Sequence, residues 1–169
     1  PEYVRERAVP VRKTGKMEDS STGRYHNMAT RKKYVQVGTG GRARFFYEAI
    51  ADRFSETSEL LAFCDMNQTR MDYANHVLSS QYGLAPLPTY TPDRFDEMVL
   101  SHRPDTVIVT SIDRTHHRYI IRAMELGCDV ISEKPMTTDE NKAQEILDAI
   151  QRTGRKLRVT FNYRYAPHN

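Results

Sequence analysis

The sequence predicts an α/β fold of the Rossmann type, a doubly wound parallel sheet with helices on both faces. Two observations carry this prediction. From Tyr34 onward, short apolar runs of strand length alternate with segments of helical periodicity, which is the pattern of successive βα units. The first apolar run also ends in a glycine-rich turn, Gly38 to Gly41, directly before a helical segment. Such a turn is typical of the first strand–helix junction in these sheets.

The expected elements follow one another along the chain. Strands are expected near residues 34–37, 59–64, 105–110, 128–132 and 157–161, with a shorter one near 87–90. Helices are expected between them, near residues 41–54, 68–81, 93–102, 114–126 and 139–152. The first helix carries Phe45, Phe46, Ala49 and Ile50. Right-handed crossovers should connect the strands.

The last of these helices has the clearest expected limits. Thr137 and Glu140 have the spacing of a capping box, and Gly154 supplies a stop. One apolar stripe is expected to face the core: Ala143, Ile146, Leu147 and Ile150.

Residues 1–33 differ in composition from the rest of the chain. They hold nine of the 25 Lys and Arg residues but four of the 22 Asp and Glu residues, which leaves sixteen basic and eighteen acidic residues beyond them. The segment has no apolar periodicity, so we expect a flexible basic extension. No aromatic platform accompanies the charges, which argues against a nucleic-acid arm. Met28 could be a native start, or the stretch could belong to a longer polypeptide.

The composition of the remainder fits one globular domain. A chain of 169 residues with 38% hydrophobic content can bury one sizeable core. No apolar run approaches the roughly 20 residues that span a bilayer, so we expect a soluble protein without a membrane partner. Cys64 and Cys128 lie far apart inside apolar runs, where cysteine is usually a small buried hydrophobe. A reducing, cytoplasmic compartment therefore fits better than a disulfide-bonded one.

The glycine-rich turn is the first candidate binding site. Gly38, Gly40 and Ala43 fit the pattern G-x-G-x-x-G/A. Gly38 allows the turn, Gly40 lets a pyrophosphate approach the backbone, and the small Ala43 lets helix and strand pack closely. The helix amides and dipole then attract the negative charge. The pattern indicates a dinucleotide site, with a turn that binds no ligand as the alternative.

An acidic residue at the end of the next strand supports the dinucleotide interpretation. Asp65 lies about 25 residues past Gly40, close to the spacing of a ribose acceptor. A carboxylate there is expected to accept both adenosine ribose hydroxyls and to repel a 2'-phosphate, which favours NAD over NADP. Arg42 and Arg70 weaken this preference, because either guanidinium could reach a phosphate, although both also fit ordinary solvated helix charges.

The segment from Val107 to Leu147 resembles the Gfo/Idh/MocA oxidoreductases, named for glucose-fructose oxidoreductase and inositol dehydrogenase. In that family a strand typically ends in Thr-Pro-Asn-x-x-His, and Glu-Lys-Pro follows a helix and a short strand. Here residues 133–135 match Glu-Lys-Pro, and His116 matches the histidine. Ile112 and Asp113 stand where Pro and Asn are usual, so we expect a differently shaped loop on the nicotinamide side.

The resemblance covers about residues 34–165 and implies hydride transfer between a sugar or cyclitol C–H and nicotinamide C4. It implies that Lys134 is catalytic, because an ammonium beside the reacting carbinol stabilises alkoxide charge and helps pass a proton. Glu133 is expected to orient Lys134 or to contact the nicotinamide side, although Ser-Glu-Lys-Pro alone also fits a surface salt-bridging turn. His116, with His117, could also simply start a helix. The expected cofactor-binding residues are Gly38, Thr39, Gly40, Gly41, Arg42, Ala43, Asp65, Thr110, Ser111, Ile112, His116, Glu133, Lys134 and Arg164.

The family normally continues for about as many residues again in a second, open-faced sheet domain, and residues 166–169 would begin the crossing into it. The resemblance implies that this domain supplies most of the substrate pocket and the homo-oligomer interface. This chain is therefore expected to be the cofactor-binding half of a longer enzyme. A non-catalytic dinucleotide-binding or regulatory module and an NAD-dependent glycosidase of the same family stay open as alternatives. No cluster of Cys, His or carboxylates has metal-ligand spacing, so we expect no metal.

Overall fold

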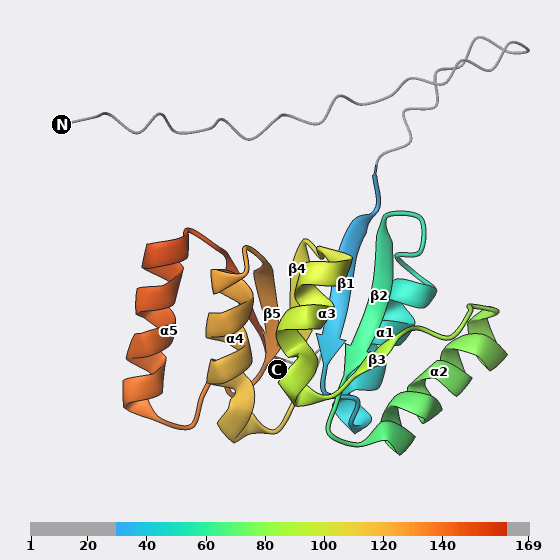
Figure 1. The fold of residues 1–169 in the computed structure, drawn as a ribbon, viewed down its shortest axis with the longest axis horizontal. Coiled ribbons are helices and arrows are strands. Elements are labelled where there is room, and N and C mark those ends of the chain that lie inside the picture. The colour runs from blue at the N-terminus through green and yellow to red at the C-terminus, as the bar shows by residue number, and fades with distance from the viewer. Residues whose placement is uncertain (1–29, 162–169) are drawn as a thin grey trace, which may run out of the picture. The chain divides into compact units, whose positions relative to one another are not determined.

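One parallel sheet of six strands organises the part of the protein that its computed structural model describes, residues 30–161 (Figure 1). The strands are β1 (Lys32–Val37), β2 (Ser58–Cys64), β3 (Thr89–Tyr90), β4 (Thr106–Val109), β5 (Asp129–Glu133) and β6 (Leu157–Thr160). They lie in the order β3-β2-β1-β4-β5-β6. The chain therefore runs outward from β1 in one direction and outward from β4 in the other, which is the topological switch of a doubly wound sheet.

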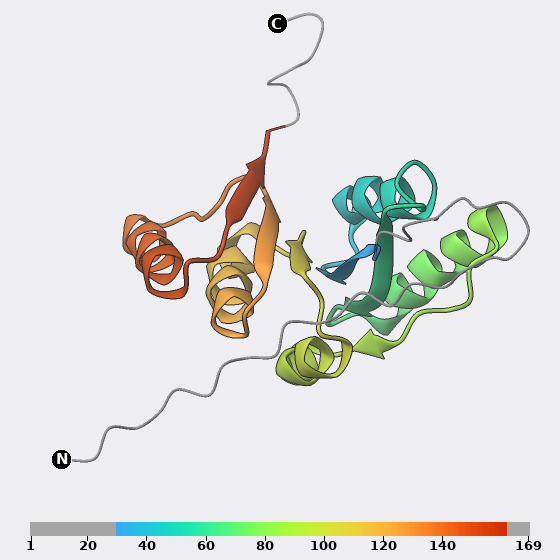
Figure 2. The same cartoon turned by 90° about the horizontal axis from the view of Figure 1, so that it is seen from above.

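Helices follow the strands and cover both faces of the sheet. They are α1 (Arg44–Ala51), α2 (Gln68–Tyr82), α3 (Phe95–His102), α4 (His116–Glu125) and α5 (Glu140–Thr153). Short 3-10 turns precede three of them: η1 (Gly41–Ala43), η2 (Pro92–Arg94) and η3 (Asp113–Thr115). Seen from above, α1 and α2 lie on one face, and α3, α4 and α5 lie on the other (Figure 2). The Rossmann-type fold predicted from the sequence is confirmed.

A separate apolar cluster fills each side of the sheet. Between the sheet and α1 and α2, the ring of Tyr47 packs edge-on against Phe63, with ring centroids 5.6 Å apart, and Leu78 is buried beside them. Between the sheet and the other three helices, Val107 and Ile120 are fully buried. Burial of each such side chain contributes about 1.5–3 kcal/mol. Each of the two helix layers therefore packs against the sheet through its own apolar cluster.

Both cysteines are buried free thiols, as expected from their apolar surroundings. Burial is the main cause that raises the pKa of the Cys64 thiol to about 12, and the neighbouring Asp65 charge adds to it. Burial likewise raises the pKa of Cys128 to about 11. Neither thiol therefore has appreciable thiolate character near neutral pH.

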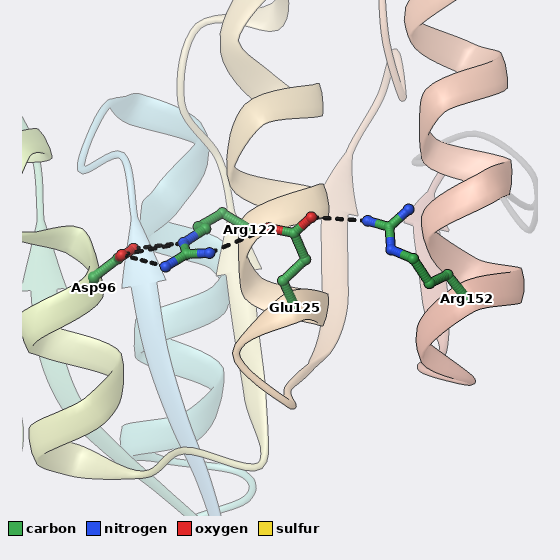
Figure 3. A network of polar contacts seen from close by, with 4 residues as sticks. All are labelled: Asp96, Arg122, Glu125 and Arg152. Atoms are coloured by element: carbon green, nitrogen blue, oxygen red, sulfur yellow. Dashed lines mark hydrogen bonds and ion pairs between the residues drawn. The ribbon is translucent and has the colours of Figure 1, made fainter.

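A polar network on the outer surface links the three helices of one layer (Figure 3). Arg122 on α4 donates from Nη2 to Oδ2 of Asp96 on α3 at 2.6 Å. Its Nη1 lies 3.2 Å from Oε2 of Glu125, and Glu125 also accepts from Arg152 on α5 at 2.8 Å. Exposed pairs of this kind are individually weak, but together they connect α3 through α4 to α5.

The start of α5 differs from the expected one. Asp139 is the N-cap, and its side chain accepts a hydrogen bond from the backbone N–H of Lys142 at 3.1 Å. The helix begins at Glu140, so Thr137 lies too far upstream to cap it. The prediction of a Thr137 capping box was wrong because several capping residue types follow one another here, and Asp is as strong a cap as Thr.

Two large apolar helix side chains are exposed, and one of them, Leu147, was predicted to face the core. Leu147 is 47% exposed. Successive residues of a helix lie about 100° apart around its axis, so Leu147 lies outside the face of α5 on which Ile146 and Ala149 are buried. Phe45 in α1 is 68% exposed for the same reason. The predicted stop at Gly154 is confirmed, since this residue caps α5 in the left-handed conformation with φ of 66°.

Some predictions fall on residues that the structure does not describe. Most of the 1–33 extension, Arg164 and the 166–169 segment lie outside the described residues. Within residues 30–161, no helix is long and apolar enough to cross a membrane. In the same range, no group of three or more His, Cys, Asp or Glu side chains could hold a metal ion.

Candidate functional site

A cleft of about 320 Å³ opens where the strand order reverses, at the carboxyl ends of β1, β2 and β4. This edge is where doubly wound sheets bind ligands. Eight predicted site residues line it: Gly38, Gly40, Gly41, Arg42, Asp65, Thr110, Ser111 and Ile112. Val37, Cys64, Met66, Arg70, Pro92, Arg114, Thr115 and Tyr119 complete the lining. The other described members of the predicted site lie outside the lining: Thr39, Ala43, His116, Glu133 and Lys134.

Gly38 occupies a position that no other residue could take without strain. Its φ is 87°, and a Cβ placed on it would lie 2.5 Å from the carbonyl of Thr110 and the backbone nitrogen of Ser111. The absence of a side chain therefore lets the loop after β1 lie directly against the end of β4. This close approach closes the floor of the cleft.

Gly40 and Gly41 lie in a different environment. A Cβ on either residue would meet no protein atom within 4 Å, so the space in front of them is open. Both residues line the cleft. η1 begins directly after Gly40 and leads into α1 at Arg44, and Ala43 between them is fully buried. An open space at the start of a helix, where backbone N–H groups and the positive end of the dipole lie, fits a diphosphate.

Two buried side chains fix the loop around this space. Thr110 donates from its hydroxyl to the carbonyl of Gly38 at 2.8 Å. Gln36 donates from Nε2 to the carbonyl of Ala43 at 3.0 Å and to the Thr110 hydroxyl oxygen at 3.1 Å. Both side chains are buried. These hydrogen bonds therefore connect the glycine loop, the start of α1 and the end of β4.

Asp65 holds the glycine loop from the opposite side. Its Oδ2 accepts from the backbone N–H of Thr39 at 2.6 Å and from the Thr39 hydroxyl at 2.9 Å. Its Oδ1 accepts from the N–H of Asn67 at 2.9 Å. The carboxylate is 8% exposed and lines the cleft. Because Oδ2 already has two donors, Oδ1 is the oxygen with remaining capacity for a ligand hydroxyl.

The loop after β4 forms a second wall. Ser111 and Thr115 share a hydrogen bond between their hydroxyls at 2.8 Å. Ile112 is 53% exposed and lines the cleft. An exposed apolar side chain at the mouth of a cleft provides a contact surface for a flat ring.

His116 lies behind this wall, at the first position of α4. It is 1% exposed, with Nε2 2.9 Å from the carbonyl of Ser111 and Nδ1 2.8 Å from the carbonyl of Pro135. Sequence reasoning proposed both a helix start and a cofactor-side role for this residue. The structure places it at the helix start and between two loops of the site, where its ring contacts carbonyls.

The Glu-Lys-Pro segment forms the turn after β5. Glu133 is 5% exposed, and its Oε2 accepts from the N–H of Lys134 at 3.0 Å. Its Oε1 lies 3.6 Å from Nε of Arg42 in the glycine loop. Lys134 itself is exposed. The turn therefore presents a lysine side chain on the surface and anchors its own backbone through a buried carboxylate.

Sequence reasoning missed several residues of the lining. Pro92 in η2 and Tyr119 in α4 reach the cleft from elements where no binding motif was recognised, whereas Arg114 lies between the motif positions Asp113 and His116. Burial is the first cause that raises the pKa of Tyr119 above its ordinary value, so its hydroxyl stays protonated near neutral pH. Only the strand order brings Pro92 and Tyr119 to the cleft, and no local sequence signal could have shown it.

Comparison with known proteins gives a consistent result. Residues 32–161 match the Gfo/Idh/MocA family, described as an oxidoreductase family with an NAD-binding Rossmann fold. The chain is 36% identical over 137 residues to YteT of Bacillus subtilis (strain 168), which is named as an oxidoreductase; the match covers 80% of this chain and 31% of YteT. It is 34% identical over 108 residues to D-glucoside 3-dehydrogenase of Escherichia coli (strain K12), covering 64% of this chain and 28% of that enzyme.

A solved structure shares the fold. Scyllo-inositol dehydrogenase from Lactobacillus casei, with bound cofactor NAD(H) and scyllo-inositol, superposes with a TM-score of 0.69 at 24% sequence identity. The superposition covers 81% of this chain and 38% of that chain. The chain spans about a third of the length of the curated relatives it matches.

Proposed function

Because this chain belongs to the Gfo/Idh/MocA family of NAD-binding oxidoreductases, we propose that it is the cofactor-binding part of an NAD-dependent enzyme that acts on a sugar or cyclitol hydroxyl. The observation that carries the proposal is the open space in front of Gly40 and Gly41, at the start of a helix and in the same cleft as Asp65. The relatives named for a D-glucoside and for scyllo-inositol support this substrate class.

The cleft residues have distinct roles in holding the dinucleotide. The backbone amides after Gly40 bind the diphosphate, since the helix N-terminus offers donors and a positive dipole end. Asp65 accepts one ribose hydroxyl through Oδ1 and holds Thr39 through Oδ2. Its negative charge disfavours a 2'-phosphate, so NADH binds more tightly than NADPH.

NAD, when bound, supplies the hydride acceptor or donor of the reaction. Lys134, exposed on the turn after β5, stabilises the developing alkoxide of the substrate and exchanges a proton with it. Glu133 orients this turn through the Lys134 amide. His116 is a positioning residue that acts through the carbonyl of Pro135.

The proposal extends to the organisation of the longer protein. The dinucleotide-binding domain begins earlier than the expected residue 34, because Lys32 and Lys33 already belong to β1. The substrate pocket and a homo-oligomer interface come from a further domain, which the greater length of the relatives supports. The buried free thiols Cys64 and Cys128 fit a reducing, cytoplasmic location.

A direct titration tests the cofactor assignment. The chain contains no tryptophan, so NADH fluorescence can be followed without indole background as the folded protein is added. We expect a saturable change in nicotinamide fluorescence that excess NAD reverses. A folded protein, verified by circular dichroism, that shows no saturable change with NADH contradicts the proposal.

A further inference from the structure

Arg42 and Glu133 form an ion pair between the glycine loop and the turn after β5. Nε of Arg42 lies 3.6 Å from Oε1 of Glu133, while the other carboxylate oxygen accepts from the N–H of Lys134. The side chain of Arg42 is 41% exposed, whereas that of Glu133 is 7% exposed. The pair therefore joins the loop that would hold a diphosphate to the turn that carries Lys134.

Glu133 gains more from this pair than Arg42 does. A buried carboxylate is unfavourable unless it is paired and hydrogen-bonded. Among residues 30–161, Arg42 is the one cation in an ion pair with Glu133. Arg42, in contrast, is partly solvated and can exchange one anion for another at small cost.

Arg42 also belongs to the cleft. It lines the cleft beside the open space at Gly40 and Gly41. Its guanidinium carbon lies 5.1 Å from the centre of the exposed Phe45 ring, a cation–π contact that supports the side chain near the start of α1. An arginine in the first turn of a diphosphate-binding helix adds its own charge to that of the amides.

We propose that Arg42 is shared between Glu133 and the diphosphate of a bound dinucleotide, so that Glu133 limits cofactor affinity. This inference rests on the proposed function. Without ligand, Arg42 neutralises Glu133. With a dinucleotide present, Arg42 turns toward the diphosphate. At 3.6 Å the contact is longer than the roughly 2.7–2.9 Å of a charge-assisted hydrogen bond, so Arg42 can leave it, at a cost borne by the buried Glu133 carboxylate.

A purely structural role for the pair makes a different prediction. If the pair only held the loop and the turn in place, removing either partner would loosen the site, and both substitutions would weaken binding. If Arg42 is shared, the two substitutions have opposite effects. The sign of the Glu133→Gln effect therefore separates the two roles.

A double-mutant cycle on the whole chain measures this sharing. Dissociation constants for NADH are determined by fluorescence for the wild type, Arg42→Met, Glu133→Gln and the double variant. We expect Glu133→Gln to tighten NADH binding by about threefold to tenfold and Arg42→Met to weaken it by about threefold. Arg42→Met should cost about tenfold or more in the Glu133→Gln background, because Glu133 then no longer competes with the diphosphate for Arg42.

Two further ligands identify the group that Arg42 binds. ADP-ribose has the diphosphate but no nicotinamide, and adenosine has neither; both are measured by competition with NADH. The coupling between the two substitutions should be the same for ADP-ribose as for NADH and absent for adenosine. A coupling seen with NADH but not with ADP-ribose overturns the diphosphate assignment.

Arg44 and Glu48 provide the matched control. They form a similar Arg–Glu pair in α1, with Nε 2.8 Å from Oε1, and neither lines the cleft. Arg44→Met and Glu48→Gln should change NADH binding by less than about twofold. Weaker binding by Glu133→Gln, or additive effects of Arg42→Met and Glu133→Gln, overturns the inference. A folded wild type that does not bind NADH overturns the proposed function itself.

Discussion

The backbone N–H of Thr39 donates to Oδ2 of Asp65 at 2.6 Å, and the Thr39 hydroxyl donates to the same oxygen at 2.9 Å. The carboxylate that the sequence suggests as a ribose acceptor is thus also the anchor of the glycine loop. The sequence alone predicts that Asp65 accepts both ribose hydroxyls, but this prediction does not include the two Thr39 donors that already bind Oδ2. The proposed preference for NADH over NADPH and the geometry of the glycine loop therefore depend on the same side chain.

Asp65→Asn should weaken NADH binding and narrow the gap between NADH and NADPH. The substitution removes a charge that repels a 2'-phosphate and a hydrogen bond to a charged group, which is worth about 1.5–3 kcal/mol. We expect the ratio of NADPH to NADH dissociation constants, measured by fluorescence titration, to fall by about tenfold. Thr39→Val is the control, because it removes one donor to Oδ2 and leaves the charge. A ratio unchanged in Asp65→Asn contradicts the role of Asp65 in cofactor choice.

Two glycine substitutions should have opposite consequences. Gly40→Val adds a branched side chain to an open space, so it should abolish NADH binding and leave circular dichroism and the melting temperature near those of the wild type. Gly38→Ala instead forces a Cβ to within 2.5 Å of backbone atoms at a positive φ, so it should destabilise the fold by about 1–3 kcal/mol or more. Urea unfolding followed by circular dichroism distinguishes the two. Retained NADH affinity in Gly40→Val means that no diphosphate lies at Gly40.

Lys134→Met should separate chemistry from cofactor binding. In the full-length enzyme, loss of one preorganised charged group commonly costs about 3–4 kcal/mol, or about 10²- to 10³-fold in turnover. NADH affinity should fall far less, by about 1 kcal/mol at most. Steady-state rates with a range of sugars and cyclitols, together with NADH titrations of the same variant, measure both effects. Turnover equal to that of the wild type removes Lys134 from the mechanism.

Asp96→Asn should lower stability at neutral pH but not in acid. Hydrogen bonding from Arg122 is the main cause that lowers the pKa of Asp96, so this contribution is present above the ordinary pKa of about 4. It is lost as the pH falls through the lowered value in the folded state. Because both side chains are nearly half exposed, we expect a loss of about 0.5–1 kcal/mol at pH 7.

Urea unfolding of the wild type and Asp96→Asn at pH 7 and at pH 3 measures this difference. Asp148→Asn is a matched control, since Asp148 accepts a hydrogen bond from Gln144 in α5 and forms no ion pair within the described residues. Equal destabilisation by Asp96→Asn at both pH values would show that the Arg122 ion pair does not stabilise the helix layer.

Local patterns explain why much of this fold could be predicted from the sequence. The glycine loop combines a turn, a close approach to the end of β4 and the start of a helix within a few residues. Gly38, Gly40 and Ala43 therefore form a pattern that can be recognised in the local sequence. The predicted strands and helices agree closely with the observed ones because each apolar run is bounded by turn residues. The capping error at Thr137 arose where two capping residues compete, and only the geometry of the chain entering α5 selects Asp139.

Contacts between distant segments could not be predicted in the same way. Arg42 and Glu133 are far apart in the sequence, and their pairing depends on β5 lying next to β4 and on the loop after β1 crossing toward it. Tyr119 reaches the cleft because of the position of α4 over the sheet. Such relationships follow from the order of the strands in the sheet. The succession of βα units in the sequence predicts this order, but it does not predict which individual side chains meet.

The ring of His116, between the carbonyls of Ser111 and Pro135, has a consequence for protein engineering. One ring nitrogen contacts the loop after β4 and the other contacts the turn after β5. If the backbone of one segment shifts and the ring follows it, the hydrogen bond of the ring to the other segment is strained. Libraries that randomise one loop at a time would sample mostly variants in which this ring has lost a partner. Libraries that vary both loops together, with His116 kept, should retain a larger share of folded clones.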